Sequence, residues 1–467
     1  MFEEFEEPQD LWKAFELGNE RERAESLSDL AEENFLKQDF ATSVTCAQES
    51  EALYTKLDDS YGIAHARFLQ GRSLRYAERY PEALELLTQA AEAFTPNARQ
   101  NYRAWVLYER GICYGKLEQF RLAQFDFHNA GLLWAHEHMG GLAGKSFIDS
   151  GETLYEQGLY TEAEFEAGQA LKHLEESDDF LPRSRALSLR SKALQKQGNF
   201  VQAIADNHDC ANILKYLQNE RLAAKVATDL AEIHLENQDP GQALTAIAAA
   251  RALYLENPHV QGSAECDYLH AMVCYQSEEY EQSRAMAQSA RSAFALTTNK
   301  HRTFNCEYLL AQLATSQDPL EGSRAFEHAL AWAAKSGFVL ESHEIYLGLA
   351  KCYLSLGRYE PALETIRKAQ RPFMADQLAD EARSIEARLL LLLDRPSEAL
   401  QLLEVVKPQD WYSLETEARA KHALGDSAAA AAAMGAVLLG LTLAGEADAA
   451  SRVAQHLADI NQAMSLN

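Results

Sequence analysis

Two clusters in the sequence have residue types and spacing that could support chemistry. Residues 144–146 read Gly-Lys-Ser, which matches the end of a loop that holds nucleotide phosphates. That loop also requires a glycine at position 139, but Met139 stands there and no strand pattern precedes it. Residues 136–138 read His-Glu-His, yet positions two apart on a helix point about 200° away from each other. We therefore predict neither a nucleotide site nor a metal site.

The rest of the chain contains no catalytic motif. No serine elbow, zinc-protease helix or cysteine–histidine arrangement occurs in a suitable context. The seven cysteines are scattered, without a CxxC pair or a regular spacing. The sequence predicts a protein that is not an enzyme, with no catalytic residues, no metal and no cofactor.

Composition restricts the partners and the compartment. The formal net charge of −27 argues against generic binding to nucleic acid or to an anionic membrane surface. Residues 1–10 lack the basic and apolar regions of a signal peptide, so we expect a cytoplasmic protein. Residues 428–445 carry no charge but are dominated by Ala and Gly, and we expect a repeat helix and a turn there rather than a membrane span.

Small residues recur at a strict spacing of forty, and this is the strongest signal in the chain. A second series follows twelve residues after the first and includes Ala123 and Ala163. Such a period indicates a repeat architecture, and small residues at fixed offsets allow helices to approach closely. We therefore expect Gly111 and Ala163 to be buried at helix contacts. The first series consists of Ala31, Gly71, Gly111, Gly151, Ser191, Ala231, Ala271 and Ala311.

Each forty-residue unit reads as two helices. Apolar residues follow helical spacing on both sides of a short interruption, at which Gly158 and Gly198 suit the left-handed position after a helix. Pro81 and Pro361 suit the first turn of a second helix. No sustained alternation predicts a strand.

The pattern resembles the tetratricopeptide repeat (TPR) family over about residues 23–437. The third unit shows it with Gly111, Tyr114, Phe120, Ala123, Phe127 and Ala130, and the ninth with Tyr346, Leu349, Ala350, Tyr353, Gly357, Tyr359, Ala362, Ile366 and Ala369. The resemblance implies an all-α, right-handed superhelical solenoid of about 11 antiparallel helix pairs. The common unit of the family has 34 residues, so the forty-residue spacing resembles the longer-repeat type of the Leu-Gly-Asn polarity adaptor and kinesin light chain.

We expect one continuous array with atypical ends. Residues 1–22 form an acidic lead in which Leu11, Trp12 and Phe15 could cover the first repeat. Residues 23–376 hold nine regular units, and residues 377–467 hold degenerate repeats and a final cap helix that begins near Ala447.

The resemblance also implies a binding groove lined by the first helix of each unit. Seven of the twenty wall residues in units two to five are basic and two are acidic, and Tyr and Arg are enriched at binding hot spots. The following units present an aromatic wall. The predicted groove residues are Phe68, Arg72, Arg75, Tyr76, Tyr108, Ile112, Lys116, Tyr155, Arg185, Lys192, Tyr268, Tyr275 and Tyr308.

We therefore expect a non-catalytic adaptor that captures a protein or peptide segment with acidic residues. The plain alternative is that these columns are only solvated helix faces. A second alternative is a receptor that closes around a small peptide or metabolite. No Asn occupies the wall position that a two-carboxylate clamp requires. The sequence names neither the partner nor the oligomeric state.

Overall fold

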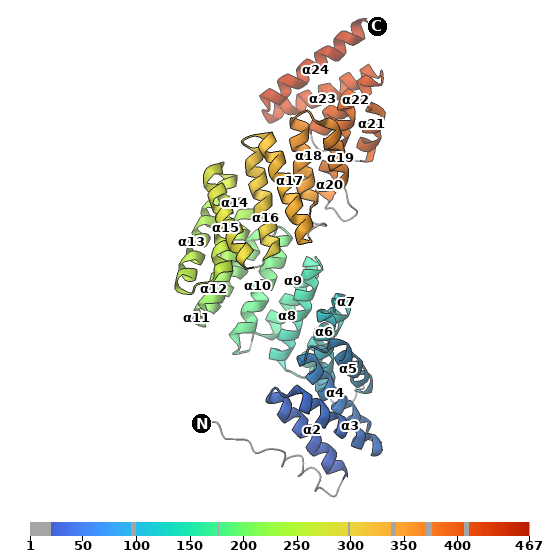
Figure 1. Cartoon of the computed structure of the whole chain (residues 1–467), viewed down its shortest axis with the longest axis vertical. Coiled ribbons are helices and arrows are strands. Elements are labelled where there is room, and N and C mark those ends of the chain that lie inside the picture. Colours follow the sequence, from blue (N-terminus) through green and yellow to red (C-terminus); the bar gives the residue numbers. More distant parts are fainter. Residues whose placement is uncertain are drawn as a thin grey trace. The chain divides into compact units, whose positions relative to one another are not determined.

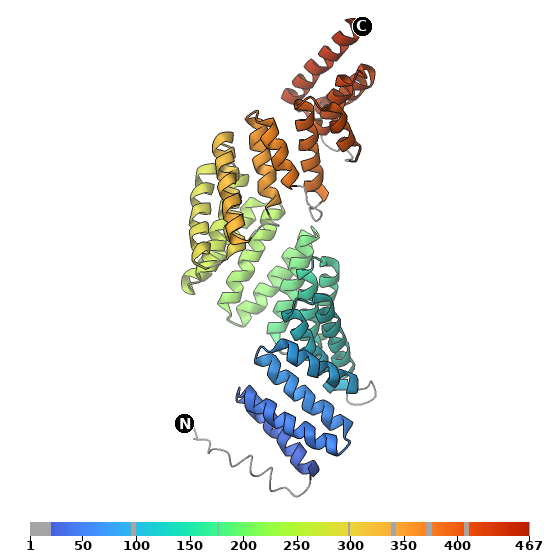
Figure 2. The ribbon, with the colours of Figure 1, turned by 45° about the vertical axis from the view of Figure 1, so that its right-hand side comes forward.

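The computed structural model describes residues 20–94, 100–175, 177–297, 299–337, 342–369, 376–405 and 411–466. Within these ranges there are 23 α-helices and no strand, so the predicted all-α class of about 11 helix pairs is confirmed. Each helix packs against the next one in antiparallel fashion within each unit (Figures 1 and 2). Leu11, Trp12 and Phe15 of the expected N-terminal lead lie outside the described residues.

The chain divides into two compact units, Met1–Asn257 and Pro258–Asn467. The expected divisions after residues 22 and 376 stay predictions. The first unit holds α2 (Glu20–Leu36), α3 (Phe40–Lys56), α4 (Ser60–Tyr76), α5 (Tyr80–Ala93), α6 (Gln100–Lys116), α7 (Phe120–His136), α8 (Gly140–Glu156), α9 (Tyr160–His173), α10 (Phe180–Lys196), α11 (Phe200–Tyr216), α12 (Glu220–Glu236) and α13 (Pro240–Glu256).

The second unit continues the succession of helix pairs. It holds α14 (Val260–Gln276), α15 (Tyr280–Leu296), α16 (Lys300–Thr315), α17 (Pro319–Ser336), α18 (His343–Ser355), α19 (Tyr359–Ala369), α20 (Asp376–Leu392), α21 (Pro396–Val405), α22 (Trp411–Ala423), α23 (Ser427–Ala444) and α24 (Ala447–Leu466).

Helices begin every twenty residues through most of the array, so both helices of a repeat have similar length. α2 begins at Glu20 and α17 ends at Ser336, which confirms the predicted forty-residue spacing of helix pairs. Most of these helices have 17 residues, and short turns join them. The helices therefore contain the extra length over a 34-residue unit.

Many of the turns share one backbone conformation. The predicted glycines adopt positive φ, with values of 77° at Gly158 and 76° at Gly198. The amide that follows this position bonds back five residues, as from Gln119 N to Tyr114 O at 2.9 Å. At other turns a residue with a side chain adopts the same conformation, which the sequence analysis did not foresee. These residues are Gln38, Asp58, Glu78, Glu118, His138, Gln218, Gln238, Glu278 and Asp394.

The small residues lie where the two helices of a repeat approach each other. Gly111 and Ala163 are buried, as predicted. A Cβ atom built on Gly111 would meet Phe127 at 2.9 Å and the carbonyl oxygen of Ala123 at 3.3 Å. In the first repeat the hydroxyl of Ser43 donates to the carbonyl oxygen of Ala31 at 2.6 Å. At these small residues, the backbone of one helix lies close enough for a short side chain of the other helix to contact it.

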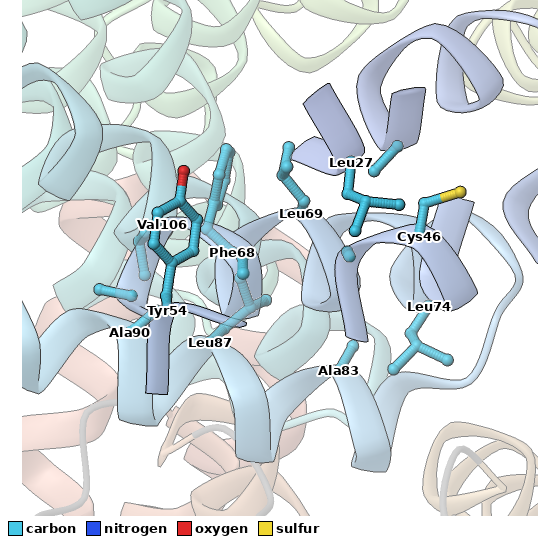
Figure 3. Close-up of a cluster of buried hydrophobic side chains, with 14 of the residues drawn as sticks. Leu27, Cys46, Tyr54, Phe68, Leu69, Leu74, Ala83, Leu87, Ala90 and Val106 are labelled. Carbon is cyan, nitrogen blue, oxygen red and sulfur yellow. The ribbon is translucent and has the colours of Figure 1, made fainter. Parts of the chain in front are cut away.

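Apolar side chains of successive helices fill the space around the small residues. In the first repeats Leu27, Cys46, Leu69 and Leu87 belong to one core cluster (Figure 3). Each repeat therefore buries its apolar residues against its own second helix and against the next repeat.

The uncharged stretch near the C-terminus forms helix α23. Among the described residues it is the helix whose length and composition would suit a membrane span. It packs on α22 and α24, and its buried residues Met434, Val437 and Leu441 belong to the core cluster shared with Val453. The stretch is thus the second helix of a repeat, followed by the turn at Gly445, as expected.

The Gly111 contact yields a test of the repeat register. Gly111→Leu is expected to destabilise the protein by about 1–3 kcal/mol or more, because the added side chain overpacks the contact with Phe127. Gly168→Leu is the matched control, since a Cβ atom there meets nothing within 4 Å. Thermal unfolding followed by circular dichroism measures both, and an unchanged Tm for Gly111→Leu would contradict the assigned contact.

The left-handed turn residues yield a second test. Glu118 is exposed and has a φ of 59°. The left-handed conformation costs roughly 1–2 kcal/mol for a residue with a Cβ atom, while glycine loses about 0.5–1 kcal/mol of extra chain entropy on folding. Glu118→Gly should therefore raise the free energy of unfolding by up to about 1 kcal/mol in urea unfolding. Glu118→Ala keeps the strain, and an equal gain in that control would refute the explanation.

Candidate functional site

The even-numbered helices form one layer of each unit. In the first unit α2 contacts α4, α4 contacts α6 and α8 contacts α10, although each pair is separated by an intervening helix. Helices that touch across a repeat lie on the more tightly curved side of the array. The first helix of each repeat therefore forms the inner wall, in the place where the resemblance put the groove.

Charged and polar side chains join the inner-wall helices of the first unit. Arg72 on α4 reaches Glu32 on α2 at 3.3 Å, and Arg75 forms an ion pair with Glu109 on α6. Tyr108 donates its hydroxyl hydrogen to Asp149 on α8 at 2.7 Å. We call this series and its continuation toward α12 the polar ladder. The remaining contacts are Arg185 with Asp149 and Glu152, Lys192 with Asp229, and Lys196 with Glu236.

The members of the ladder differ in burial. The side chains of Arg75 and Glu109 are 12% and 5% exposed, so the pair is nearly removed from water. Burial raises the pKa of the Glu109 carboxyl, and the adjacent Arg75 charge opposes that shift. Burial also raises the pKa of Asp149, against the hydrogen bond from Tyr108 and the charge of Arg185. These carboxylates depend on their partners because a lone buried charge is costly.

The ladder changes the expected electrostatics of the wall. Arg72, Arg75, Arg185 and Lys192 were expected to attract an acidic ligand, but each contacts an acidic side chain of a neighbouring helix. Their charges are therefore largely compensated within the protein. Lys116, at the exposed end of α6, has no ion pair within the described part of the chain.

A cavity of about 460 Å³ opens between α8, α10 and α12 in the first unit. The predicted groove residues Tyr155, Arg185 and Lys192 all line it. Its apolar lining residues are Leu181, Leu189, Leu214, Leu222 and Val226, together with the thiol-bearing Cys210, and its further polar lining residues are Glu152, Glu156, Ser184, Ser188, Lys225 and Asp229. The volume lies within the roughly 300–1,000 Å³ of ligand sites, and such apolar pockets with a few polar groups commonly bind ligands.

The remaining predicted residues of the first unit lie on α4 and α6, outside this cavity. Phe68 is buried in the core cluster of Figure 3, because its helix packs on both sides, so it offers little contact surface. Arg72 lies 4.1 Å from the ring centroid of Phe35, and Tyr76 stacks on Phe40 with centroids 5.6 Å apart. Ile112 is half-buried on α6.

The aromatic residues predicted for the second unit are half-buried. Tyr268 lies on α14 within 5.3 Å of the Arg302 guanidinium, and Tyr308 on α16 packs against Phe326 with centroids 6.0 Å apart. Burial raises the pKa of Tyr275 and of Tyr308. These rings therefore contribute to packing between helices as well as to the wall.

Sequence reasoning missed three acidic members of the ladder and one cation of the cavity. Glu109, Asp149 and Asp229 share one column of the forty-residue register, which was not among the wall columns used for the prediction, whereas Glu152 and Glu236 lie in wall columns that were used. Lys225 continues a column that runs through Lys145 and Arg185. A search of every column for charges would have found both groups.

The two sequence motifs that suggested a nucleotide site and a metal site lie in a helix and in a turn between helices. Residues 144–146 lie inside α8, where Gly144 is buried against Leu174, and they form no loop. His138 lies in the turn after α7 with a φ of 58°, so the helical angle assumed for residues 136–138 does not apply. Among the described residues no group of three or more His, Cys, Asp or Glu side chains is placed to hold a metal ion.

Comparisons with known proteins agree with this architecture. Residues 68–112 and 324–377 match a family model described as tetratricopeptide repeat. The fold resembles the apo form of the quorum sensor NprR from B. thuringiensis, with a TM-score of 0.51 and 15% identity over 72% of this chain and 98% of that chain. A comparison with curated protein sequences finds no significant match.

Two further solved structures are less similar. Aspartyl phosphate phosphatase F from Bacillus subtilis has a TM-score of 0.49 and 13% identity, over 74% of this chain and 92% of that chain. Yeast Tom70 has a TM-score of 0.41 and 14% identity, over 96% of this chain and 97% of that chain.

The fold and the inner wall define a helical repeat protein built from stacked antiparallel pairs. The matched segments specify the kind of repeat: residues 68–112 and 324–377 carry tetratricopeptide repeats, and the other helix pairs continue the same architecture.

The buried pair of the ladder yields a test. Arg75→Ala should lower the free energy of unfolding by about 3–5 kcal/mol, because it leaves the Glu109 carboxylate buried without its partner. Adding Glu109→Gln should return part of the loss. Arg79→Ala is the matched control, since the pair of Arg79 with Glu82 is exposed and its loss should change stability little. Equal losses for Arg75→Ala and Arg79→Ala in urea unfolding would refute the role of the ladder.

Proposed function

We propose that this protein is a non-catalytic scaffold that captures a segment of a partner protein along the inner wall of its first unit. The observation that carries this proposal is the cavity between α8, α10 and α12, which brings the predicted residues Tyr155, Arg185 and Lys192 together beside a group of apolar lining side chains. An apolar side chain of the partner gains free energy by leaving water in such a pocket, and the charged lining residues orient the segment.

The finer parts of the proposal concern the ligand, the subfamily and the compartment. The forty-residue helix pairs support a place among the longer-repeat adaptors, and we propose a cytoplasmic protein. Because most wall cations are paired internally, acidic residues in the partner provide selectivity more than affinity.

Filling the cavity tests the proposal. Ser188→Trp adds a large ring to the lining and should reduce partner capture at least tenfold, since the ring occupies the space of the partner's side chain. Val201→Trp is the matched control, because Val201 lies on the outer helix α11 and is 84% exposed. Affinity capture from the native cell, read by quantitative mass spectrometry, compares these variants with wild type. Undiminished capture by Ser188→Trp with intact circular dichroism would contradict the site.

The cavity volume supports a second candidate function. A space of about 460 Å³ also suits a small peptide or metabolite, as in a sensing receptor. Native mass spectrometry of protein purified from its own cell distinguishes the two. A bound small molecule that Ser188→Trp abolishes would favour the receptor.

A further inference from the structure

Some of the charged residues that line the cavity form ion pairs with each other, and others do not. Arg185 and Glu152 form an ion pair at 2.9 Å, and Lys192 and Asp229 form one at 3.2 Å. The other two charged lining residues are Lys225 and Glu156, and neither has an ion pair within the described part of the chain. The lining therefore leaves one cation and one anion available to a ligand.

These two charges lie at opposite ends of the site. The helices α8, α10 and α12 run parallel, because each is antiparallel to the helix between them. Lys225 lies near the start of α12, and Glu156 is the last residue of α8. The helical rise places them about 16 Å apart along the axes. Sideways they are separated by the packed spacing of α8 and α10, about 8–10 Å, and by the wider gap from α10 to α12, which the cavity holds apart.

The apolar surface lies between the two ends. Leu189 and the paired Arg185 and Lys192 belong to α10, the central helix of the three. Leu214 of α11 adds to the lining from the outer layer. A chain that crosses from Glu156 to Lys225 therefore passes over neutralised ion pairs and apolar side chains in its middle.

Resting on the proposed function, we propose that the groove selects a partner segment of opposite charges at its two ends. The segment has a large apolar residue in the cavity, an acidic residue beside Lys225 and a basic residue beside Glu156. The diagonal is therefore at least about 25 Å, which corresponds to roughly seven or more extended residues between the two charges. Lys225 repels the basic end of the segment and Glu156 repels its acidic end. The arrangement therefore also sets the direction in which the chain binds.

A peptide selection tests this proposal. Random peptides of about twelve residues, displayed on phage, are selected in parallel on the full-length protein and on a charge-swapped variant, Lys225→Glu with Glu156→Lys. Both substitutions lie at exposed positions, and circular dichroism verifies that the variant is folded. Ser188→Trp serves as the counter-selection for binding outside the cavity.

On wild type we expect peptides with one large apolar residue between an acidic and a basic residue. On the charge-swapped variant the order of the two charges along the peptide should be reversed, and wild-type peptides should bind it about tenfold more weakly. Peptides that need the open cavity but are acidic on both sides, or uncharged, would overturn this inference and leave the proposed function standing. Peptides that bind Ser188→Trp as well as wild type would overturn the proposed function itself.

Discussion

The close approach of the two helices within each repeat is the constraint on which the rest of this structure depends. At Gly71, Gly111 and Gly151 a Cβ atom would meet a side chain at under 3.0 Å, with a carbonyl oxygen of the second helix only 3.3 Å away. No large residue fits this column. Because the helix axes are held this close, each repeat presents its neighbour with the same surface, and the inner-wall helices come near enough to touch across repeats.

This constraint explains why the fold was predictable from the sequence. A residue that must be small at one contact in every repeat leaves a period in the chain, and the helix pairs follow from that period. The turns were harder to predict, because Glu118 and Gln38 adopt a conformation usually marked by glycine. Nothing in their residue types signals it, and the surrounding helices enforce it.

The candidate site was predictable only in part. The cavity residues Tyr155, Arg185 and Lys192 lay in the wall columns that the resemblance supplied. The compensation of the wall cations was missed, since it depends on which acidic column lies beside which basic one. Asp149 accepts from both Tyr108 and Arg185, on two different helices, and only three-dimensional packing brings these together. The charges counted at equivalent positions of the repeats are thus a poor guide to the electrostatic potential that a ligand meets at the wall.

The shared turn conformation has a consequence for the growth of such a chain. Asp58, His138 and Gln218 join successive repeats with the same positive φ that Gln38 and Glu118 use inside a repeat. At these turns the backbone therefore does not distinguish inner helices from outer ones, and only the side chains do. Duplication or loss of forty residues preserves every layer, whereas loss of twenty would exchange the layers beyond that point and expose the polar ladder on the outer surface. A change in length that keeps both layers intact must therefore add or remove whole helix pairs, although helices begin every twenty residues.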